Sequence, residues 1–462
     1  MFERTKAMSL GLLGCRGRHT ISNMLVTMER HHDDWSADYR AFSRAEWDVR
    51  KLFGIPKRHV LGWIPREQPI VAALDDTKLH KTGMKIPGVS YQRDPLSPAF
   101  HTNFIRAQRF VQISVTVPLD SESASPARAF PVAFEHAPPP KKPSRQATDE
   151  ERKDYKKRQQ TQNLSCAGVR MMEALRNDYD ELGQVARKLV FTVDGSYTNK
   201  TVLKNLPART SIIGRIRKDA KLFSFPNTQP SLGRKRIYGA QAPTPEELRV
   251  DDLTPWQSVK AFAAGKTHDF SVKITGPLLW KKAGSDQPVR LLVIRPLSYR
   301  LTKAGRLLYR QPAFLICTDP TLTLEEIVQW YVWRWDIEVN HRDEKQLIGV
   351  GEAQVRSEKA VERVPAFAVA SYSMLLVASA LCYGIDANLP LIKPPKWREK
   401  SVENQVRLTT GQMLEQLRQN SLRMRWPETL SNSGHFDGKR YRNTKCPKYK
   451  PTDTAENASA RN

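Results

Sequence analysis

Two short apolar runs, each followed at once by an acid, constrain the fold of this chain more than any other feature. The first, IVAAL at 70–74, precedes Asp75, and the second, LVFTV at 189–193, precedes Asp194. Continuous apolar runs of this length are typical of strands that are buried on both faces. Such strands need helices on both sides of their sheet, so the sequence predicts an α/β fold. We expect both strands to end at their acids.

The segments around these runs predict further strands, a loop and several helices. Alternation at 110–117 predicts a half-exposed strand, and 211–216 is a third candidate for a buried one. Residues 119–147, which include the Pro-rich run at 138–143, are expected to form an extended surface loop. Strand-like runs between 226 and 312 predict a β-rich insertion. Helices are expected at 148–182, 324–347, 361–382 and 403–419.

The large positive net charge of the chain indicates which kind of partner it binds. Lys and Arg number 74 against 48 Asp and Glu, which gives a net charge of +26 over 462 residues. Because such a charge repels itself in the folded state, it favours a polyanionic partner such as nucleic acid. Five scattered cysteines without a CxxC pair argue against a disulfide framework or a zinc ribbon, and they fit a reducing compartment. No apolar run is expected to be long enough to span a membrane, so no membrane partner is predicted.

The two ends of the chain differ from its middle. Residues 1–64 are expected to be helical and rich in aromatic side chains. The polar-led segment 20–25 fits the reading helix of a helix-turn-helix, which would make this region a DNA-binding one. A capped helix in a small bundle explains the same pattern equally well. The segment after 390 has 15 Lys or Arg against 7 Asp or Glu, and its end is expected to be disordered.

One narrow stripe of a predicted helix carries the chemistry. Tyr331, Arg334, Glu338 and Lys345 are separated by three, four and seven residues. At about 100° per residue, these steps place all four side chains within an arc of roughly 60°. The stripe therefore presents a phenol, a guanidinium, a carboxylate and an ammonium to one neighbour. An exposed polar stripe with a weak Arg334–Glu338 pair accounts for the same spacing. Three further acids of this segment lie off the stripe and are expected to be solvated: Asp336, Asp343 and Glu344.

The acids after the two apolar runs favour a catalytic interpretation of the stripe. Asp75, Asp194 and Glu338 form a set that can hold two hard divalent ions about 3.5–4 Å apart. In such a site one ion activates the attacking water or 3′-hydroxyl and the other stabilises the leaving oxygen. The other members of the stripe would then bind the phosphates beside the scissile bond. Acids at strand ends also serve as turn formers or helix caps, so a purely structural interpretation stays open.

The spacing Tyr-x2-Arg-x3-Glu-x6-Lys resembles the signature of one branch of the DDE insertion-sequence transposases, the YREK branch. Asp75 and Thr77 resemble the first motif of that branch, Asp-x-Thr, and Asp194 resembles its second. The resemblance covers about residues 15–385.

The resemblance implies a multidomain α/β enzyme with an RNase H-like mixed sheet as its catalytic core. The 144 positions between Asp194 and Glu338 leave room for a β-rich insertion in that core. The implied regions are a helical N-terminal DNA-binding region (1–64), the first part of the core (65–225), the insertion (226–312), the second part of the core with the catalytic Glu helix (313–390) and a basic C-terminal region (391–462).

The resemblance also implies the reaction, which is strand cleavage at transposon ends followed by strand transfer into target DNA. Asp75, Asp194 and Glu338 would be the catalytic and metal-binding residues, with two Mg²⁺ ions for which Mn²⁺ substitutes. The implied partners are double-stranded DNA, as inverted-repeat ends and as target, and a second copy of the chain in a paired-end complex. The expected location is the cytoplasm, at the nucleoid. The residues implied to bind the backbone of the transposon end are Tyr331, Arg334 and Lys345.

Three positions depart from the pattern of the branch. Asp76 rivals Asp75 as the first metal ligand, although alignment on Thr77 favours Asp75. Gly195 stands where many relatives carry an Arg after the second Asp, which puts one phosphate contact in doubt. Phe314 occupies the place where some relatives stack a Trp on a flipped base; it could stack in the same way, but a core role explains it better.

Two other functions stay open at this point. A metal-dependent nuclease on the same fold would cut DNA without strand transfer, and it would need no phosphate-binding stripe. A non-catalytic DNA-binding protein derived from a transposase would keep its basic surfaces while its acids were lost. The presence of all three acids and of the stripe favours the transposase over both.

Overall fold

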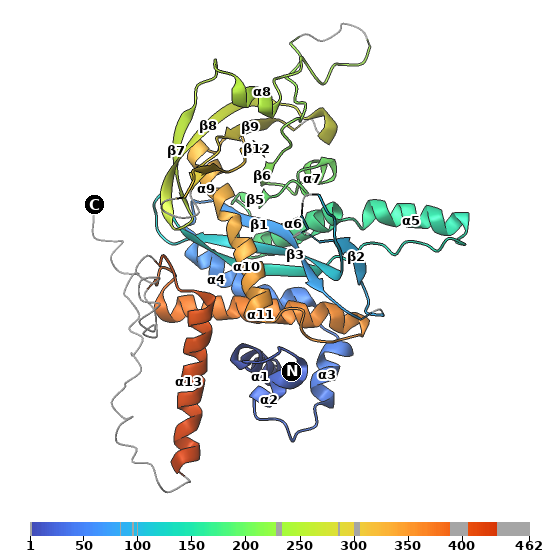
Figure 1. The fold of residues 1–462 in the computed structure, drawn as a ribbon, viewed down its shortest axis with the longest axis vertical. Helices are drawn as coiled ribbons and strands as arrows, with labels where there is room; N and C mark the ends of the chain where they lie inside the picture. The colour runs from blue at the N-terminus through green and yellow to red at the C-terminus, as the bar shows by residue number, and fades with distance from the viewer. Residues whose placement is uncertain are drawn as a thin grey trace.

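One ten-stranded sheet runs through the protein, and helices cover both of its faces (Figure 1). Its strand order is β2-β3-β1-β5-β6-β12-β9-β8-β7, and β4 pairs with β3. The computed structural model describes residues 2–83, 85–94, 97–98, 100–227, 233–284, 287–299, 305–388 and 405–431.

Five strands form the mixed sheet of the core. β4, β3 and β1 are antiparallel neighbours, whereas β5 runs parallel to β1 and β6 runs parallel to β5. The predicted α/β fold with an RNase H-like mixed sheet is confirmed. The strands are β1 (Ile70–His80), β3 (Phe104–Pro118), β4 (Ala127–His136), β5 (Leu189–Val193) and β6 (Thr210–Arg215), with the short β2 (Ser90–Arg93) at the edge of β3.

The β-rich insertion extends this sheet and does not form a separate layer. β12 (Ala313–Cys317), which follows the insertion, pairs antiparallel with β6 on one side and with β9 of the insertion on the other, so the insertion continues the core sheet beyond β12. The elements of the insertion are α8 (Pro245–Val250), β7 (Gln257–Ala263), β8 (Lys266–Leu278), η2 (Lys281–Ala283), β9 (Val289–Ile294) and the hairpin of β10 (Ser298–Tyr299) with β11 (Leu308–Tyr309).

Helices lie on both faces of the core strands because β1 is apolar on both faces. Val71 packs in one hydrophobic cluster with Ile327 and Val328 of α9. On the other face, a Cβ added at Gly168 of α6 would lie 3.7 Å from the Leu74 side chain. The helices that surround the core are α5 (Asp149–Thr161), α6 (Leu164–Glu181), α7 (Lys200–Lys204), α9 (Leu324–Trp333), α10 (Trp335–Gln346) and α11 (Glu358–Tyr383).

α11 overturns one expectation from the sequence. Residues 365–382 carry no charged side chain, and this helix is long and apolar enough to cross a membrane by length and composition. Of its most apolar stretch, 78% is buried inside the protein. It packs on β4 and on the N-terminal helices, which is the position of a core helix.

The N-terminal segment forms a small set of helices beneath the sheet (Figure 1). α2 begins after Thr20, whose side chain accepts a hydrogen bond from the Asn23 amide, and it packs on α1 through Met24 and Leu25. These features are those of a capped helix in a bundle. The elements are α1 (Phe2–Gly14), α2 (Ile21–Thr27), α3 (Ser36–Ser43), η1 (Val49–Phe53) and α4 (Gly54–Trp63).

The predicted end of one strand and one predicted loop were wrong. β1 does not end at Asp75 but continues to His80, because its second half pairs with β3. The expected loop 119–147 contains β4, whose Phe130, Val132 and Phe134 are buried. The rest of that segment, 119–126 and 137–147, is irregular.

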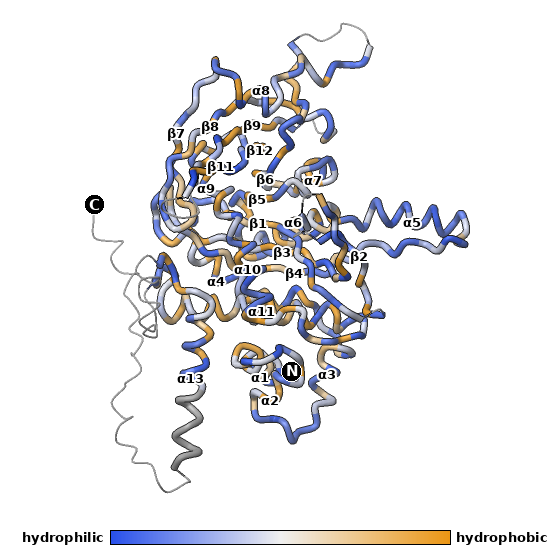
Figure 2. The backbone as a smooth tube through the Cα atoms, in the orientation of Figure 1, coloured by the Kyte–Doolittle hydropathy of each residue, from blue (hydrophilic) through white to orange (hydrophobic). Residues whose placement is uncertain are grey.

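Three helix predictions also need correction. The helix expected at 148–182 is two helices, because Asn163 caps α6 by accepting from the Cys166 amide. α5 buries no residue and is hydrophilic along most of its length (Figure 2). The helix expected at 324–347 breaks at Arg334 into α9 and α10. The helix expected at 403–419 is α13 (Thr410–Ser431). The end of the chain, predicted to be disordered, lies outside the described residues.

Candidate active site

The register of the core strands brings two acids together. Leu74 of β1 lies opposite Val193 of the parallel strand β5, so the next residues along each chain, Asp75 and Asp194, come side by side. Asp194 follows the last residue of β5, as predicted, and its carboxylate accepts hydrogen bonds from the Ser196 amide at 2.9 Å and hydroxyl at 3.1 Å. These bonds fix the Asp194 side chain in a tight turn.

Helix α10 crosses the face of the sheet that carries Asp75. Gln112 of β3 lies opposite Asp75 and Ser114 lies opposite Ala73, so these side chains share one face. Asn340 of α10 donates to the Ser114 hydroxyl at 3.1 Å and to the Ala129 carbonyl at 3.2 Å. The buried amide of Asn340 thereby fixes α10 over the acids.

Asp76 points away from α10. Side chains alternate along a strand, so Asp76 lies on the face opposite to that of Asp75. There it is 3.6 Å from Arg109, its partner in an ion pair. The two candidates for the first acid are therefore on different faces, and Asp75 is the one on the face of Glu338.

Arg334 lies between two of the acids. Its Nη2 donates to Glu338 Oε1 at 2.9 Å, and its Nη1 is 3.6 Å from Asp75 Oδ2. It stands at the junction of α9 and α10, where its amide bonds the Tyr331 carbonyl three residues back. Its guanidinium is 5.7 Å from the centre of the Tyr331 ring. One largely buried cation thus connects β1 with the helix that carries Glu338.

Two carboxyl groups of the site have raised pKa values, because they are largely buried and lie close to other acids. Burial raises the pKa of Asp75 to about 7, the charge of Asp194 adds to this rise, and Arg334 opposes it. Burial also raises the pKa of Asp76, against the effect of Arg109. Two anions this close in a buried place favour either a proton or a cation between them.

The other stripe residues border the same acids. Tyr331 is partly buried, and burial raises the pKa of its phenol while Arg334 lowers it. Lys345 is exposed, and its charge interacts with those of Asp75 and Asp76. The break at Arg334 means that the stripe spans two helices and not one straight helix.

The donor set suits a hard divalent ion, because it consists of carboxylate oxygens alone. Asp75 and Asp194 are close enough for one charge to raise the pKa of the other. Among the described residues, no three acidic, His or Cys side chains lie close enough to hold an ion together, since Arg334 holds Glu338. A third carboxylate ligand requires that Arg334 release Glu338.

A comparison with protein families identifies the family of this chain. The model of the family described as DDE superfamily endonuclease matches residues 2–270. The chain belongs to this family. The matched segment holds β1 and β5, and with them Asp75 and Asp194, whereas Glu338 lies beyond it. No curated protein matches the chain. Enzymes of this superfamily generally depend on divalent metal ions.

In this endonuclease a buried polar network behind α10 was not foreseen. Asp336, expected to be solvated, forms a bidentate pair with Arg407 at 2.7 and 2.9 Å. Asp343 is buried and accepts from Thr410 at 2.7 Å. Glu344 is also buried, which raises its pKa to about 8. Helical spacing places these acids off the stripe correctly, but the partners of Asp336 and Asp343 lie 71 and 67 residues away and carry no local signal.

Phe314 of the endonuclease is a core residue. It is 7% exposed and packs with Leu291 and Val293 in the hydrophobic cluster of the insertion. One edge of its side chain borders a groove next to β6. The sequence prediction that a plain core role explains Phe314 agrees with this burial, and base stacking by Phe314 stays a prediction.

Proposed function

We propose that this endonuclease is a DNA transposase that cleaves the ends of a mobile element and joins them to target DNA. The observation that carries the proposal is that Arg334 lies within reach of both Asp75 and Glu338, while the charge of Asp194 acts on Asp75 and those of Tyr331 and Lys345 act on the same group of residues. The YREK branch is the one whose spacing these residues match. The alternative of a DNA-binding protein without acids loses support, because all three acids are present and Arg334 links Asp75 with Glu338.

In this proposal Asp75, Asp194 and Glu338 hold two divalent ions, Mg²⁺ or in its place Mn²⁺. When bound, the ions activate the attacking hydroxyl and stabilise the leaving oxygen. Asp75, rather than Asp76, is the first ligand, since Asp76 lies on the far face and pairs with Arg109. The pKa of Asp75, near 7, means that this carboxyl gives up a proton when a cation takes its place beside Asp194.

Arg334 exchanges partners in the proposed cycle. Without DNA it neutralises Glu338 and Asp75. Its Nε is buried and has no hydrogen-bond acceptor within the described chain, so the guanidinium keeps a donor for a phosphate oxygen. Tyr331 and Lys345 bind the same backbone, the first through its hydroxyl and the second through its charge. Binding of DNA thereby frees Glu338 to complete the ligand set.

The proposed setting is a paired-end complex of two copies of the chain, with inverted-repeat ends and target DNA, at the nucleoid in the cytoplasm. The N-terminal helices of residues 1–64 are proposed to bind DNA, and the net charge of +26 suits this partner. A nuclease without strand transfer is the second candidate, because the family description names an endonuclease.

The test uses labelled duplexes that carry the boundary of the element, a supercoiled target plasmid and Mg²⁺. Wild type is expected to nick at the boundary and to join the freed 3′ end to the plasmid, and Arg334→Ala is expected to do neither. Glu181→Ala, an exposed acid at the end of α6, serves as the matched control and is expected to behave as wild type. Nicking without joined product, even from pre-cleaved ends, would favour the nuclease.

A further inference from the structure

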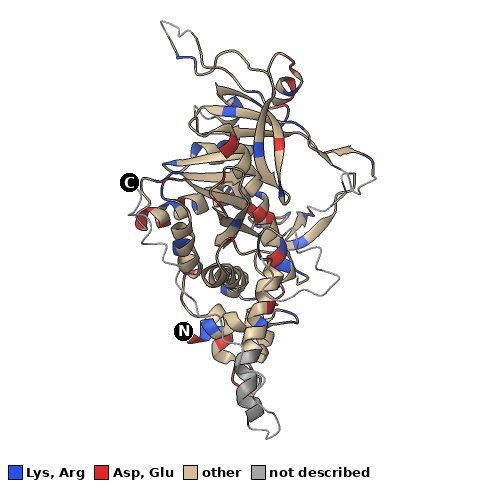
Figure 3. Ribbon diagram, turned by 90° about the vertical axis from the view of Figure 1, so that its left-hand side faces the viewer, with Lys and Arg blue, Asp and Glu red and all other residues tan. Residues whose placement is uncertain are grey.

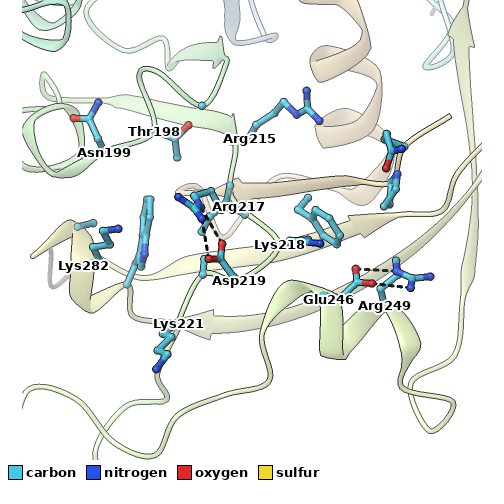
Figure 4. A pocket seen from close by; sticks show the side chains of 18 of the residues that line it. Thr198, Asn199, Arg215, Arg217, Lys218, Asp219, Lys221, Glu246, Arg249 and Lys282 are labelled. Carbon is cyan, nitrogen blue, oxygen red and sulfur yellow. Dashed lines mark hydrogen bonds and ion pairs between the residues drawn. The ribbon is translucent and has the colours of Figure 1, made fainter. Parts of the chain in front are cut away.

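A broad groove opens between the loop after Asp194 and the insertion (Figure 4). Its volume is about 1610 Å³. Gly195 and Thr198 border it on the side of the site, residues 215–221 form its floor beyond β6, and residues 280–283 and 309–312 border it from the insertion. The groove therefore begins one residue beyond a proposed metal ligand.

The groove is strongly cationic. Nine of its eleven charged lining residues are Lys or Arg. Both acids are already neutralised, Asp219 by Arg217 at 2.9 Å and Glu246 by Arg249 at 2.7 Å. Lys and Arg are spread over helices and strands of the whole fold (Figure 3), so the net charge alone singles out no surface. This groove stands out because its acids are few and paired.

None of its five lysines has an ion-pair partner among the described residues, and three of the five are Lys218, Lys221 and Lys282. Figure 4 shows their side chains around the same opening as Arg217 and Asp219. Unneutralised cations that face a common space repel one another, which favours a polyanion between them.

Aromatic side chains interleave with these cations. Phe223, Trp280 and Tyr309 line the groove, and Tyr309 is 65% exposed. The Lys281 ammonium lies 5.7 Å from the centre of the Phe223 ring. Cations that follow a backbone, together with aromatic rings on which bases stack, are typical of sites for unpaired nucleic acid. A duplex keeps its base faces stacked inside, so it offers phosphates but no faces to these rings.

Arg215 links the groove to the proposed active site. It ends β6, lines the groove, and its charge interacts with Tyr331 at the end of α9. In Figure 4 its guanidinium extends away from the lysines toward a neighbouring helix. A DNA strand bound by Tyr331 and Arg334 has, through Arg215, a continuous path of cations into the groove.

From these observations we infer that the groove binds an unpaired DNA strand that leads away from the scissile phosphate. This inference rests on the proposed function, because it takes the carboxylates beside Asp194 as the place of cleavage. The lysines bind phosphates and the exposed ring of Tyr309 stacks on a base.

The test measures binding alone, with EDTA present so that nothing is cleaved. Fluorescence anisotropy of a labelled 20-nucleotide oligothymidine and of a duplex of equal length is followed against salt for the full chain. The triple variant Lys218→Ala, Lys221→Ala, Lys282→Ala removes three groove charges. The matched control is Lys153→Ala, Lys156→Ala, Lys157→Ala, which removes three exposed charges from α5.

The triple groove variant is expected to weaken single-strand binding at least tenfold and to lower the slope of log K against log salt by about 2, since each phosphate contact contributes about 0.7. Tyr309→Ala is expected to weaken it roughly tenfold and Tyr309→Phe to restore it. Duplex binding and the α5 control are expected to stay within twofold of wild type. Because Tyr309 is exposed, its variants test the inference even if the triple variant fails to fold.

Equal losses in the groove and α5 variants, or single-strand binding unchanged in both groove variants, would overturn the inference. A parallel loss of duplex and single-strand binding would overturn it too, as it would show a general cationic surface. Asp194→Ala is included and is expected to bind oligothymidine like wild type. If wild type binds oligothymidine in the groove as expected but does not cleave in the separate assay with Mg²⁺, the result would count against the proposed function alone.

Discussion

Replacing Asp75 with Asn is expected to stabilise the metal-free protein at high pH. The pKa of this carboxyl rises from 3.8 to about 7 because it is buried next to Asp194. In the unfolded chain the group ionises first, so the folded state loses stability as pH rises from about 4 to about 7. Three pH units at about 1.4 kcal/mol each give a cost of up to about 4 kcal/mol above pH 7.

The Asn variant carries no such charge, so its advantage over wild type is expected to grow across that window and then to level off. The assay is urea denaturation of both proteins in EDTA between pH 5 and 9, with the difference in unfolding free energy plotted against pH. Glu181→Gln controls for the loss of an exposed acid and is expected to give a flat difference. With Mg²⁺ added, wild type is expected to gain stability and Asp75→Asn to gain little, because ligand binding stabilises only the state that binds it.

The reasoning is refuted if the difference between Asp75→Asn and wild type does not change between pH 5 and 8. It is also refuted if the variant is less stable than wild type at pH 8, since that would mean that Arg334 compensates the Asp75 charge in full.

Three further perturbations test the packing of the fold. Arg407→Ala removes a largely buried bidentate partner from Asp336 and is expected to cost about 2 kcal/mol and to lower cleavage, and an unchanged urea midpoint would contradict this. Gly349→Ala is expected to lower the melting temperature more than Gly265→Ala. Both glycines have positive φ, but only at Gly349 would a Cβ meet a side chain, the His19 ring at 2.4 Å, and equal shifts would argue against this. Burial lowers the pKa of His136 to about 4, so stability is lost as pH falls from about 6.5 to about 4. In a plot of melting temperature against pH, His136→Asn is expected to remove most of the loss between about 6.5 and about 4. An unchanged plot would show that His136 does not cause this loss.

Local pattern predicted the strands that are apolar throughout. β5 and β9 coincide with the apolar runs that predicted them, because nothing but burial decides where such strands lie. β4 was missed because two prolines disguise it. Pro126 precedes the strand, and Pro131 sits where the register with β3 shifts, at a place that needs no ladder hydrogen bond.

The sequence proposed the members of the site, but it did not predict the contacts among them. Motif spacing identified Asp75, Asp194 and Glu338, and it left Asp75 and Asp76 as rivals. The two lie on opposite faces because β1 continues past Asp75 and pairs with β3, whereas the sequence pattern predicted that the strand ends there. The pairing of Arg334 with Asp75 joins residues from different elements, and nothing in either local sequence records it.

The most direct test of the central claim is a change of ligand chemistry at two proposed metal ligands. Asp194→Cys and Glu338→Cys replace a hard oxygen with a softer sulfur, which suits Mn²⁺ better than Mg²⁺. Cleavage of duplexes that carry the element boundary is measured in each ion, with Glu181→Cys as the control. The account predicts that both variants lose cleavage in Mg²⁺ and regain part of it in Mn²⁺, while the control cuts in both. Wild-type cleavage by either variant in Mg²⁺ would contradict the claim that Asp194 and Glu338 hold the catalytic ions.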